Sequence, residues 1–462
     1  MTDPTLLLEL EQEAIVNRPV KPLSPRARFV ASASGTFIEW YDFFIYGSLA
    51  TVLAVKFFPQ TDPAVALLAT LAGLGAGFVM RPIGAVFFGW LGDRRGRKKT
   101  FISTLIIMGV STTLMGLIPT YETIGIAATV LLVFLRLAQG FAIGGEYGGA
   151  ATFVAEHASE GRRGRVTSIL QATQTLGVLA AVLFLVALRA VLGAEQFDAW
   201  GWRVPFLVSG VLVVLSFGVR LRISETPVFE HMHDAGSNTP LRAILSNPKT
   251  VGRILFAVFG VTAGMGAMWY ASHSYSQVFL VNSVGMDLLQ ANIALAAALA
   301  LGLPFFIIFG AWSDRVGRLP IIVTGMTLLT LTTIPLYSAM RIAAEAGNVV
   351  GVALTLLPQI IFVAMVNGPV GAYLVDLFAP AIRTTGVSIA YHLGTGIFGG
   401  FSPFIAQSIV TGTGNIMLGV LYPTIVAGIA SVIGISALCV QRARRRNPSG
   451  RQPEPVDIAE AV

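Results

Sequence analysis

The sequence predicts an all-α polytopic membrane protein with twelve transmembrane helices, arranged as two repeats of six. Three observations predict this fold class. The first is composition: 54% of the 462 residues are hydrophobic, 12% are charged and the mean hydropathy is +0.74, whereas soluble domains carry about 25% charged residues. The second is the number of apolar segments that reach the ~20 residues needed to cross a ~30 Å hydrocarbon core. The third is an internal repeat of charged motifs.

The first repeated motif is a cluster of charge between two long apolar segments. It reads GWLGDRRGRKK at Gly89–Lys99 and returns in weaker form as GAWSDRVGR at Gly310–Arg318. Alignment of Asp93 with Asp314 gives an offset of 221 residues. The glycines in both copies would allow helix ends to approach each other closely.

A second pair of charges repeats at almost the same distance. Glu156 precedes Arg163 by seven residues, Asp376 precedes Arg383 by seven, and both members are offset by 220 residues. Two unrelated patterns at nearly one offset, in a chain with so little charge, indicate a duplicated unit of about half the chain. Internal duplication of this kind is a construction principle of membrane transporters.

Taken in order, the chain is expected to begin with a cytoplasmic tail at 1–28, which has neither the basic start nor the cleavage site of a signal peptide. Two six-helix halves follow at 29–221 and 251–441, joined by a polar, proline-containing cytoplasmic linker at 222–250, and a basic cytoplasmic tail ends the chain at 442–462. The fourth, seventh and tenth spans are too long for a perpendicular crossing and are expected to tilt, kink or protrude. The predicted spans are 29–57, 65–92, 100–118, 124–156, 166–190, 203–221, 251–281, 288–313, 320–342, 348–378, 385–411 and 415–441.

The distribution of Lys and Arg predicts that both termini are cytoplasmic. With that orientation, all but six of the 31 basic residues fall in tails, inner loops or inner helix ends, as the positive-inside rule requires. These residues therefore set the topology and face anionic lipids, so the net charge of +7 does not indicate a nucleic-acid partner. We expect a multi-pass monomer in the plasma (inner) membrane. The exceptions are Lys56, Arg81, Arg136, Arg189, Arg203 and Arg341.

Several other function classes lack support in the sequence. No His-Glu-x-x-His, Gly-x-Ser-x-Gly or Walker-type motif is present, so neither an enzyme nor an ATPase is expected. The single cysteine, Cys439, excludes an internal disulfide and a multi-cysteine metal site. We expect no cofactor and no metal, and an ion gradient as the energy source. A channel and a sensor that binds ligand without flux are weaker alternatives.

The repeated charged motifs are expected at the cytoplasmic ends of helices, where we interpret them as a cytoplasmic gate. A carboxylate there can accept hydrogen bonds from helix N-terminal amides and from arginine. The alternative is that these charges only orient the chain and solubilise its loops. The predicted gate residues are Gly89, Asp93, Arg94, Arg97, Glu156, Arg163, Asp314, Arg318, Asp376 and Arg383.

Further stretches make the chain resemble a known family: FIEWYDF at 37–43, RPIG at 81–84, RLAQGFAIGGE at 136–146, GWRVPF at 201–206 and SETP at 224–227. Together with Gly89–Lys99, they are typical of the metabolite:proton symporter family of the major facilitator superfamily, which includes shikimate, α-ketoglutarate, citrate and proline/betaine permeases. The resemblance covers nearly the whole membrane portion and implies the major facilitator fold and secondary active transport. Asp376, where glutamate is usual, and His392, where a smaller polar residue is frequent, depart from the family pattern.

Ionisable residues at membrane depth are the candidates for proton coupling, because an unpaired charge there costs several kcal/mol. At 1.5 Å per residue, Glu39, Arg81 and Arg136 each lie ~15–18 Å from a helix end, near the midplane. Asp42 lies on roughly the same helix face as Glu39, and Glu146 lies between this depth and the gate. We predict that Glu39, Asp42 and Glu146 carry the proton.

A carboxylate and arginines that face one cavity can couple a proton to a substrate. The ionised carboxylate neutralises an arginine, and protonation frees that arginine for an anionic substrate whose carboxylate matches the planar guanidinium. The alternative is a structural ion-pair network, and for His273 and His392 a hydrogen-bonded core position is equally expected. The predicted substrate-binding residues are Arg81, Arg136, Gln174, Tyr270, His273, Gln277, Asn367, Tyr391 and His392.

The sequence therefore predicts a secondary active transporter that takes up a small organic acid with a proton by alternating access. The substrate class is a mono-, di- or tricarboxylate, and the expected partners are this substrate, the proton and the lipid bilayer. An uncoupled facilitator or exporter and a symporter of zwitterions of the proline/betaine type stay open as alternatives.

The topology predicts which loops an impermeant reagent can reach. In a Cys439→Ser background, a cysteine in place of Thr61 should react with a membrane-impermeant thiol reagent in whole cells. A cysteine in place of Arg97 should not react, because its loop is predicted to be cytoplasmic. The reverse labelling pattern would contradict the orientation.

Overall fold

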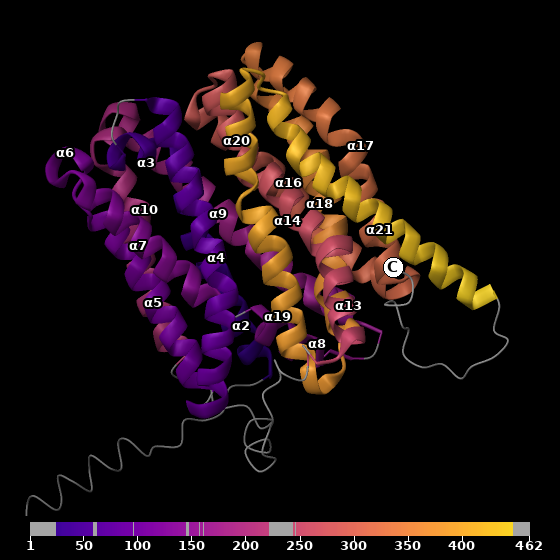
Figure 1. The fold of residues 1–462 in the computed structure, drawn as a ribbon. Coiled ribbons are helices and arrows are strands. Elements are labelled where there is room, and N and C mark those ends of the chain that lie inside the picture. Colours follow the sequence, from indigo (N-terminus) through magenta and orange to yellow (C-terminus); the bar gives the residue numbers. More distant parts are fainter. Residues whose placement is uncertain are drawn as a thin grey trace, which may run out of the picture.

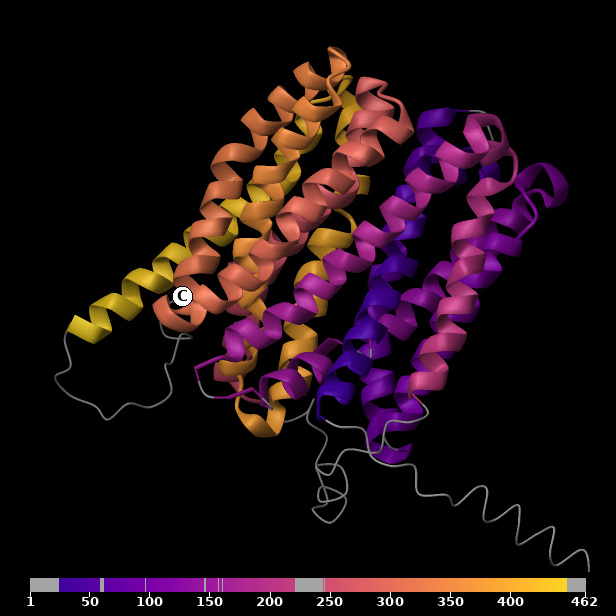
Figure 2. The same cartoon turned by 180° about the vertical axis from the view of Figure 1, so that it is seen from behind.

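The computed structural model describes residues 25–58, 62–95, 97–144, 147–156, 158–159, 161–220, 244 and 246–446. Every regular element in these residues is a helix. The helices form two groups that stand side by side, coloured indigo to magenta and rose to yellow in Figure 1. Figure 2 shows the same division from behind. The two groups are the N-terminal and C-terminal halves of the two-repeat fold.

Within the described residues, the N-terminal half contains six helical segments at the positions of the first six predicted spans. Its first span is a bent pair of helices, α2 (Pro25–Ser48) and α3 (Ala50–Phe57). Its fourth span is α7 (Ile126–Ile143) followed by α8 (Tyr147–Glu156). The remaining elements are α4 (Pro63–Arg95), α5 (Arg97–Leu117), the short α6 (Tyr121–Ile124), α9 (Arg163–Ala199), the 3-10 turn η1 (Gly201–Arg203) and α10 (Val204–Arg220).

The C-terminal half also contains six spans, and two of them are interrupted by π-helical turns. The α-helices are α13 (Pro248–Ala257), α14 (Ala263–Tyr270), α15 (Ser276–Val278), α16 (Leu288–Val316), α17 (Arg318–Glu345), α18 (Val349–Leu377), α19 (Arg383–Leu393), α20 (Ser402–Thr413) and α21 (Leu421–Arg446). The π-helical turns are η2 (Val258–Thr262), η3 (Ala271–Tyr275), η4 (Phe279–Val284) and η6 (Gly394–Gly399). The 3-10 turns are η5 (Pro380–Ile382) and η7 (Leu418–Val420).

These elements confirm the predicted fold class. Ten helical segments are long and apolar enough to cross a membrane, the bent pair α2–α3 is the eleventh, and Ile102–Leu117 is a shorter apolar helix at the third predicted span. The predicted seventh span, too long for a straight crossing, is the segment Pro248–Val284 that contains η2, η3 and η4. Each π-helical turn accommodates an extra residue relative to an α-helical turn.

Two predicted spans differ from the structure. The first was predicted as one helix at 29–57, but the chain bends by 61° at the junction of α2 and α3. The bend leaves the Ser48 carbonyl free to accept a hydrogen bond from Gln277 of the other half, at 3.1 Å. The fifth span was predicted to end at 190, whereas α9 continues to Ala199 across a non-helical residue, Gly193.

Glycines set the closest helix contacts. A Cβ at Gly140 of α7 would overlap the carbonyl oxygen of Gly77 of α4. Across the two halves, a Cβ at Gly164 of α9 would lie 2.5 Å from the carbonyl oxygen of Gly310 of α16. Small residues at such positions let membrane helices pack backbone to backbone, which explains part of the 49 glycines of the chain.

Successive spans run in opposite directions, so each end of the bundle carries the ends of helices from both halves. We call the end where α2 begins and α21 ends the proximal end, and the opposite end the distal end (Figure 1). Between the halves, α9 packs against α16 and α18, α8 against α19, and α4 against α19, η6 and α20. The interface therefore runs along most of the bundle.

Candidate functional site

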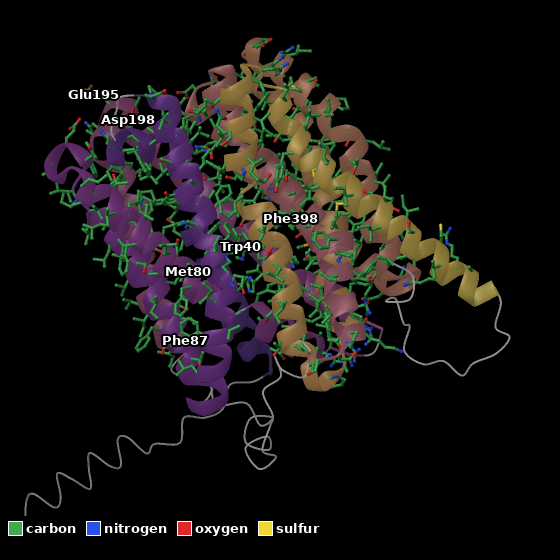
Figure 3. The ribbon with its side chains drawn as sticks, viewed as in Figure 1. Trp40, Met80, Phe87, Glu195, Asp198 and Phe398 are labelled. Atoms are coloured by element: carbon green, nitrogen blue, oxygen red, sulfur yellow. The ribbon has the colours of Figure 1, made fainter. Side chains whose placement is uncertain are left out.

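A small cavity lies between the two halves. Both halves contribute to its wall, and Figure 3 shows one wall residue, Trp40, between them. The lining residues are Trp40, Arg81 and Gln174 of the N-terminal half and Met265, Gly266, Trp269, Tyr270, Asn367, Tyr391 and Thr395 of the C-terminal half.

Aromatic rings form much of the wall and cross the interface. The rings of Trp40 and Trp269 meet edge to face with centroids 4.8 Å apart, and Trp269 meets Tyr270 at the same distance. Phe78 of α4 packs on Tyr270 at 5.2 Å. Aromatic faces carry negative potential and attract cations, so this wall can contact an alkyl or ammonium group.

Among the described residues that line the cavity, Arg81 is the only charged one. Its side chain is buried, and the guanidinium carbon lies 3.9 Å from the ring centroid of Phe78 and 4.7 Å from that of Phe43. Its Nε has no hydrogen-bond partner in the part of the chain that the structure describes. The guanidinium therefore lies against aromatic rings and keeps its Nε as a donor for a carboxylate.

Glu39 and Asp42 occupy different surroundings although both lie on α2. Glu39 is buried within electrostatic range of the cavity residues Tyr270 and Tyr391. Asp42 is fully buried beside the hydroxyl groups of Thr112 and Ser209, on α5 and α10. Its two carboxylate oxygens have no hydrogen-bond partner of good geometry among the described residues. Glu39 therefore belongs to the interface between the halves, and Asp42 to the interior of the N-terminal half.

Arg136 lies behind the cavity wall and does not line the cavity. Its guanidinium carbon is 4.0 Å from the ring centroid of Phe43 and 4.6 Å from that of Tyr46. Its Nη1 donates to Oε1 of Gln139. Both arginines therefore lie against the ring of Phe43, but only Arg81 lines the cavity, whereas the sequence analysis expected both arginines to face one cavity.

On the C-terminal side, Tyr270, Asn367 and Tyr391 line the cavity, as does Gln174 of α9. Tyr391 also stacks on Tyr147 of α8, with ring centroids 3.4 Å apart. This stacked pair joins the halves on the proximal side of the cavity, and Gln171 donates to the Tyr147 hydroxyl at 2.9 Å.

Besides Arg136, three predicted substrate-binding residues do not line the cavity. His273 stacks on Trp269 at 4.2 Å, and its Nδ1 lies 2.9 Å from the Trp269 carbonyl oxygen. His392 is buried next to Tyr147 and Tyr391. Gln277 donates to the Ser48 carbonyl at 3.1 Å and to Asn292 Oδ1 at 2.8 Å, toward the distal end.

The sequence analysis missed Trp40, Met265, Gly266, Trp269 and Thr395 as cavity residues. The only available signal was for Trp40, which lies between Glu39 and Asp42 in the motif at 37–43. Glu146 lies outside the described residues. Gly89, Asp93, Arg94 and Arg97 lie in α4 and α5, but their side chains lie outside the description.

At the proximal end, the C-terminal copy of the repeated motif caps a helix of the other half. The backbone N–H groups of Gly164 and Arg165, at the start of α9, donate to the two carboxylate oxygens of Asp314 at 2.7 and 2.9 Å. A carboxylate at a helix N-terminus satisfies orphan amides and complements the helix dipole. Arg318, four residues on, lies 3.8 Å from the same carboxylate.

The second repeated pattern pairs crosswise between the halves. Arg383 of the C-terminal half donates to Glu156 of the N-terminal half at 2.8 Å, and Arg163 donates to Asp376 at 3.3 Å. Arg318 also pairs with Asp376. Each acid therefore contacts the arginine of the other repeat and not the arginine seven residues away in its own repeat.

The distal end has its own contacts between the halves, which the sequence analysis did not predict. Arg189 of α9 forms an ion pair with Asp287 at 3.1 Å. Asn282 of η4 donates to Thr51 of α3 at 3.0 Å. Together with the Gln277–Ser48 bond, these contacts join the halves on the distal side, as Asp314 and the Glu156–Arg383 and Arg163–Asp376 pairs join them on the proximal side.

Comparison with known proteins identifies the family. Residues 27–239 match the family described as "Sugar (and other) transporter", and residues 273–461 match "Major Facilitator Superfamily". The proline/betaine transporter of Salmonella typhimurium is 31% identical over 446 residues, which cover 94% of this chain and 87% of the relative. The chain belongs to the major facilitator superfamily.

Other relatives and structures agree with this membership. The citrate-proton symporter of Salmonella typhi is 35% identical over 385 residues, or 83% of this chain and 87% of that protein. The partially occluded, inward-open structure of the xylose transporter XylE from E. coli superposes with a TM-score of 0.69 at 16% identity, over 92% of this chain and 99% of that one. At this identity the likeness shows the fold alone. The protein is thus a multi-pass membrane transporter of the major facilitator superfamily and not an enzyme.

Within the described residues, no group of three His, Cys, Asp or Glu side chains could hold a metal ion. The cavity instead offers one buried arginine, an acidic residue in electrostatic range and an aromatic wall. These groups can bind, orient and exchange a proton without covalent chemistry.

The helix cap at Asp314 is expected to hold the proximal end closed. Replacing Asp314 by Asn removes the charge that complements the α9 N-terminus, so single cysteines placed at the proximal end should become more accessible to a thiol reagent. Arg315→Gln, which removes the exposed neighbouring charge, is the matched control. Unchanged accessibility and transport in Asp314→Asn would leave these residues without a gating role.

Proposed function

We propose that this protein is a proton-coupled symporter that takes up a small solute carrying one carboxylate. The observation that carries the proposal is Arg81: it is buried, it lines the central cavity, and its Nε has no hydrogen-bond partner among the described residues. A guanidinium in a water-poor cavity is a strong donor for a carboxylate. The relative named as a proline/betaine transporter supports a solute with one carboxylate, and the relative named as a citrate-proton symporter supports coupling to a proton.

Two carboxyl groups are proposed to carry the coupled proton. Asp42 is buried without a hydrogen bond of good geometry, and an uncompensated buried charge is costly, so this residue must gain a partner or a proton as the conformation changes. Glu39 lies in electrostatic range of the cavity tyrosines, where a charge on it would change the net charge that a substrate meets. Glu146 stays a prediction of the sequence alone.

The solute with one carboxylate can be an anionic organic acid or, as a second candidate, a zwitterion. The aromatic wall favours the zwitterion. A single cavity arginine can pair with one carboxylate, whereas a tricarboxylate would bring two further charges without a cationic partner among the described lining residues. The rings of Trp40, Trp269 and Tyr270 can hold an ammonium group opposite Arg81. A solute without net charge would also leave unchanged the net charge that Arg81 and Glu39 give to the site.

The remaining features of the proposal follow from the Lys and Arg distribution. We place the proximal end, both termini and the 222–250 linker in the cytoplasm, and the protein in the inner membrane as a monomer with halves at 29–221 and 251–441. The gate residues at the proximal end would then close the route to the cytoplasm, and the Arg189–Asp287 pair would close the route from outside.

Two isosteric solutes can separate the substrate classes. Trimethylglycine and 3,3-dimethylbutanoate have the same shape and carboxylate and differ only in a quaternary nitrogen in place of a carbon. If the aromatic wall holds a cation, trimethylglycine should bind roughly tenfold or more tightly, since a desolvated cation–π contact contributes ~2 kcal/mol. Calorimetric titration of the purified protein, followed by counterflow, measures this ratio. Tighter binding of 3,3-dimethylbutanoate would identify the substrate as an anionic organic acid. Choline has the quaternary nitrogen but lacks the carboxylate, so its binding tests whether the contact with Arg81 is needed.

Amide substitutions can locate the proton. Asp42→Asn and Glu39→Gln keep the shape of the side chain but cannot ionise, so the residue that carries the proton should lose uphill accumulation and keep counterflow. Arg81→Lys should weaken binding itself, because a point ammonium cannot reproduce a planar fork. The measurement compares proteoliposomes under an imposed pH gradient with counterflow at equal pH. Full accumulation in both amide variants would place the proton site elsewhere.

A further inference from the structure

We infer that Gln139 is a positioning residue that transmits the protonation state of Asp42 to Arg136 through a directed chain of hydrogen bonds. The inference rests on the proposed proton coupling and adds a residue that the motif analysis did not single out for a role. Asp42 and Arg136 are on α2 and α7 of the same half, and the described residues contain no ion pair between them. A neutral bridge takes the place of that ion pair.

The bridge consists of two side chains. Arg136 Nη1 donates to Gln139 Oε1, and Gln139 Nε2 donates to Thr112 Oγ1 at 2.8 Å. Thr112 in turn lies beside the carboxylate of Asp42. Arg136, Gln139, Thr112 and Asp42 are each at most 1% exposed, so water does not compete for these bonds.

The chemistry of the groups fixes the direction of the chain. A guanidinium can only donate, so Gln139 must present its carbonyl oxygen to Arg136 and its NH2 group to Thr112. The Thr112 oxygen therefore accepts, and its single proton is left for one of two acceptors. One is the Met108 carbonyl, 2.9 Å away, which the hydroxyl contacts in this structure. The other is the Asp42 carboxylate.

The choice between these acceptors creates two states. When Asp42 is ionised, the Thr112 proton turns to the carboxylate in a charge-assisted bond. The chain then runs without a break from cation to anion, and each bond polarises the next. When Asp42 takes a proton, the hydroxyl returns to Met108, the chain loses its anionic end, and the charge of Arg136 is less compensated.

Arg136 can pass this change to the cavity through Phe43. The two guanidinium carbons lie 4.0 Å (Arg136) and 4.7 Å (Arg81) from the same Phe43 ring centroid. A shift of Arg136 therefore acts on the ring that positions Arg81 in the cavity wall. The other titratable and charged groups around the chain are Tyr41 beside Asp42, and Tyr46, Arg81 and Tyr270 around Arg136.

Substitutions at Gln139 and Thr112 test the chain with a matched control. Gln139→Leu and Thr112→Val remove one link each with little change in volume, and Thr112→Ser keeps the hydroxyl. Thr113→Val is the control, because the Thr113 hydroxyl makes the same kind of bond, to Gly109 O at 2.7 Å, outside the chain. The probe is labelled trimethylglycine or 3,3-dimethylbutanoate, whichever the wild-type protein accumulates more in proteoliposomes under an imposed pH gradient.

Gln139→Leu and Thr112→Val should lower gradient-driven accumulation about tenfold, which corresponds to ~1.4 kcal/mol of lost coupling. Counterflow at equal pH should stay within about threefold of wild type, and Thr112→Ser and Thr113→Val should accumulate the probe. Accumulation equal to wild type in both broken-chain variants overturns the inference, as does a proportional loss of accumulation and counterflow.

The melting temperature in detergent separates this result from misfolding. If Gln139→Leu does not fold, Thr112→Val interrupts the same chain one bond further on and decides the question alone. Wild-type protein that accumulates neither probe would contradict the proposed function itself and remove the coupling on which the inference rests. If the wild-type protein accumulates a probe and both broken-chain variants accumulate it equally, only the inference about Gln139 is contradicted.

Discussion

The burial of two arginines in the N-terminal half is the constraint on which the rest of the site depends. Arg81 and Arg136 are each at most 2% exposed, and both guanidinium groups lie against the ring of Phe43. A desolvated cation–π contact contributes ~2 kcal/mol, whereas the effective cost of burying an ion is several kcal/mol. Aromatic contacts alone cannot compensate these charges. The half must therefore keep an anion or a chain of polarised bonds within reach, which makes the site responsive to protons and to anionic solutes.

The duplication is used differently at the two ends of the bundle. At the proximal end, the acids of one repeat meet arginines and helix amides of the other, at Glu156–Arg383, Arg163–Asp376 and Asp314–Gly164. At the distal end, one partly exposed ion pair and amide hydrogen bonds join the halves. Exposed ion pairs contribute only ~0–1 kcal/mol each, so neither set of contacts forms a barrier that a transported solute could not overcome.

The sequence could predict how deep the ionisable residues lie in the bundle, but not which neighbours their side chains face. The rise per residue placed Glu39, Arg81 and Arg136 near midplane, and all three are buried, yet it could not show that Asp42 turns toward Thr112. Residues at i and i+3 differ by ~60° around a helix, and packing decides which neighbour each one meets. The sequence also did not predict that Glu156 and Asp376 pair with arginines of the other half. The seven-residue spacing describes each repeat separately and carries no information about contacts between repeats. The sequence did not indicate that Trp269 lines the cavity, because an aromatic residue in a membrane helix ordinarily contributes to apolar packing.

The two halves have complementary backbones as well as complementary side chains. In the N-terminal half, Asp42, Arg81 and Arg136 lie on α-helices α2, α4 and α7, which fix their positions. In the C-terminal half, the π-helical turns η2 and η6 pack against each other, and a Cβ at Gly394 of η6 would overlap Thr262 of η2. Thr262 also donates to the Ala390 carbonyl of α19 at 2.8 Å. Helix α14, which carries cavity residues, follows η2 directly and packs against η6. Because π-helical turns are irregular and often occur at functional sites, this half can adapt its wall to a solute while the other half holds its charges in place.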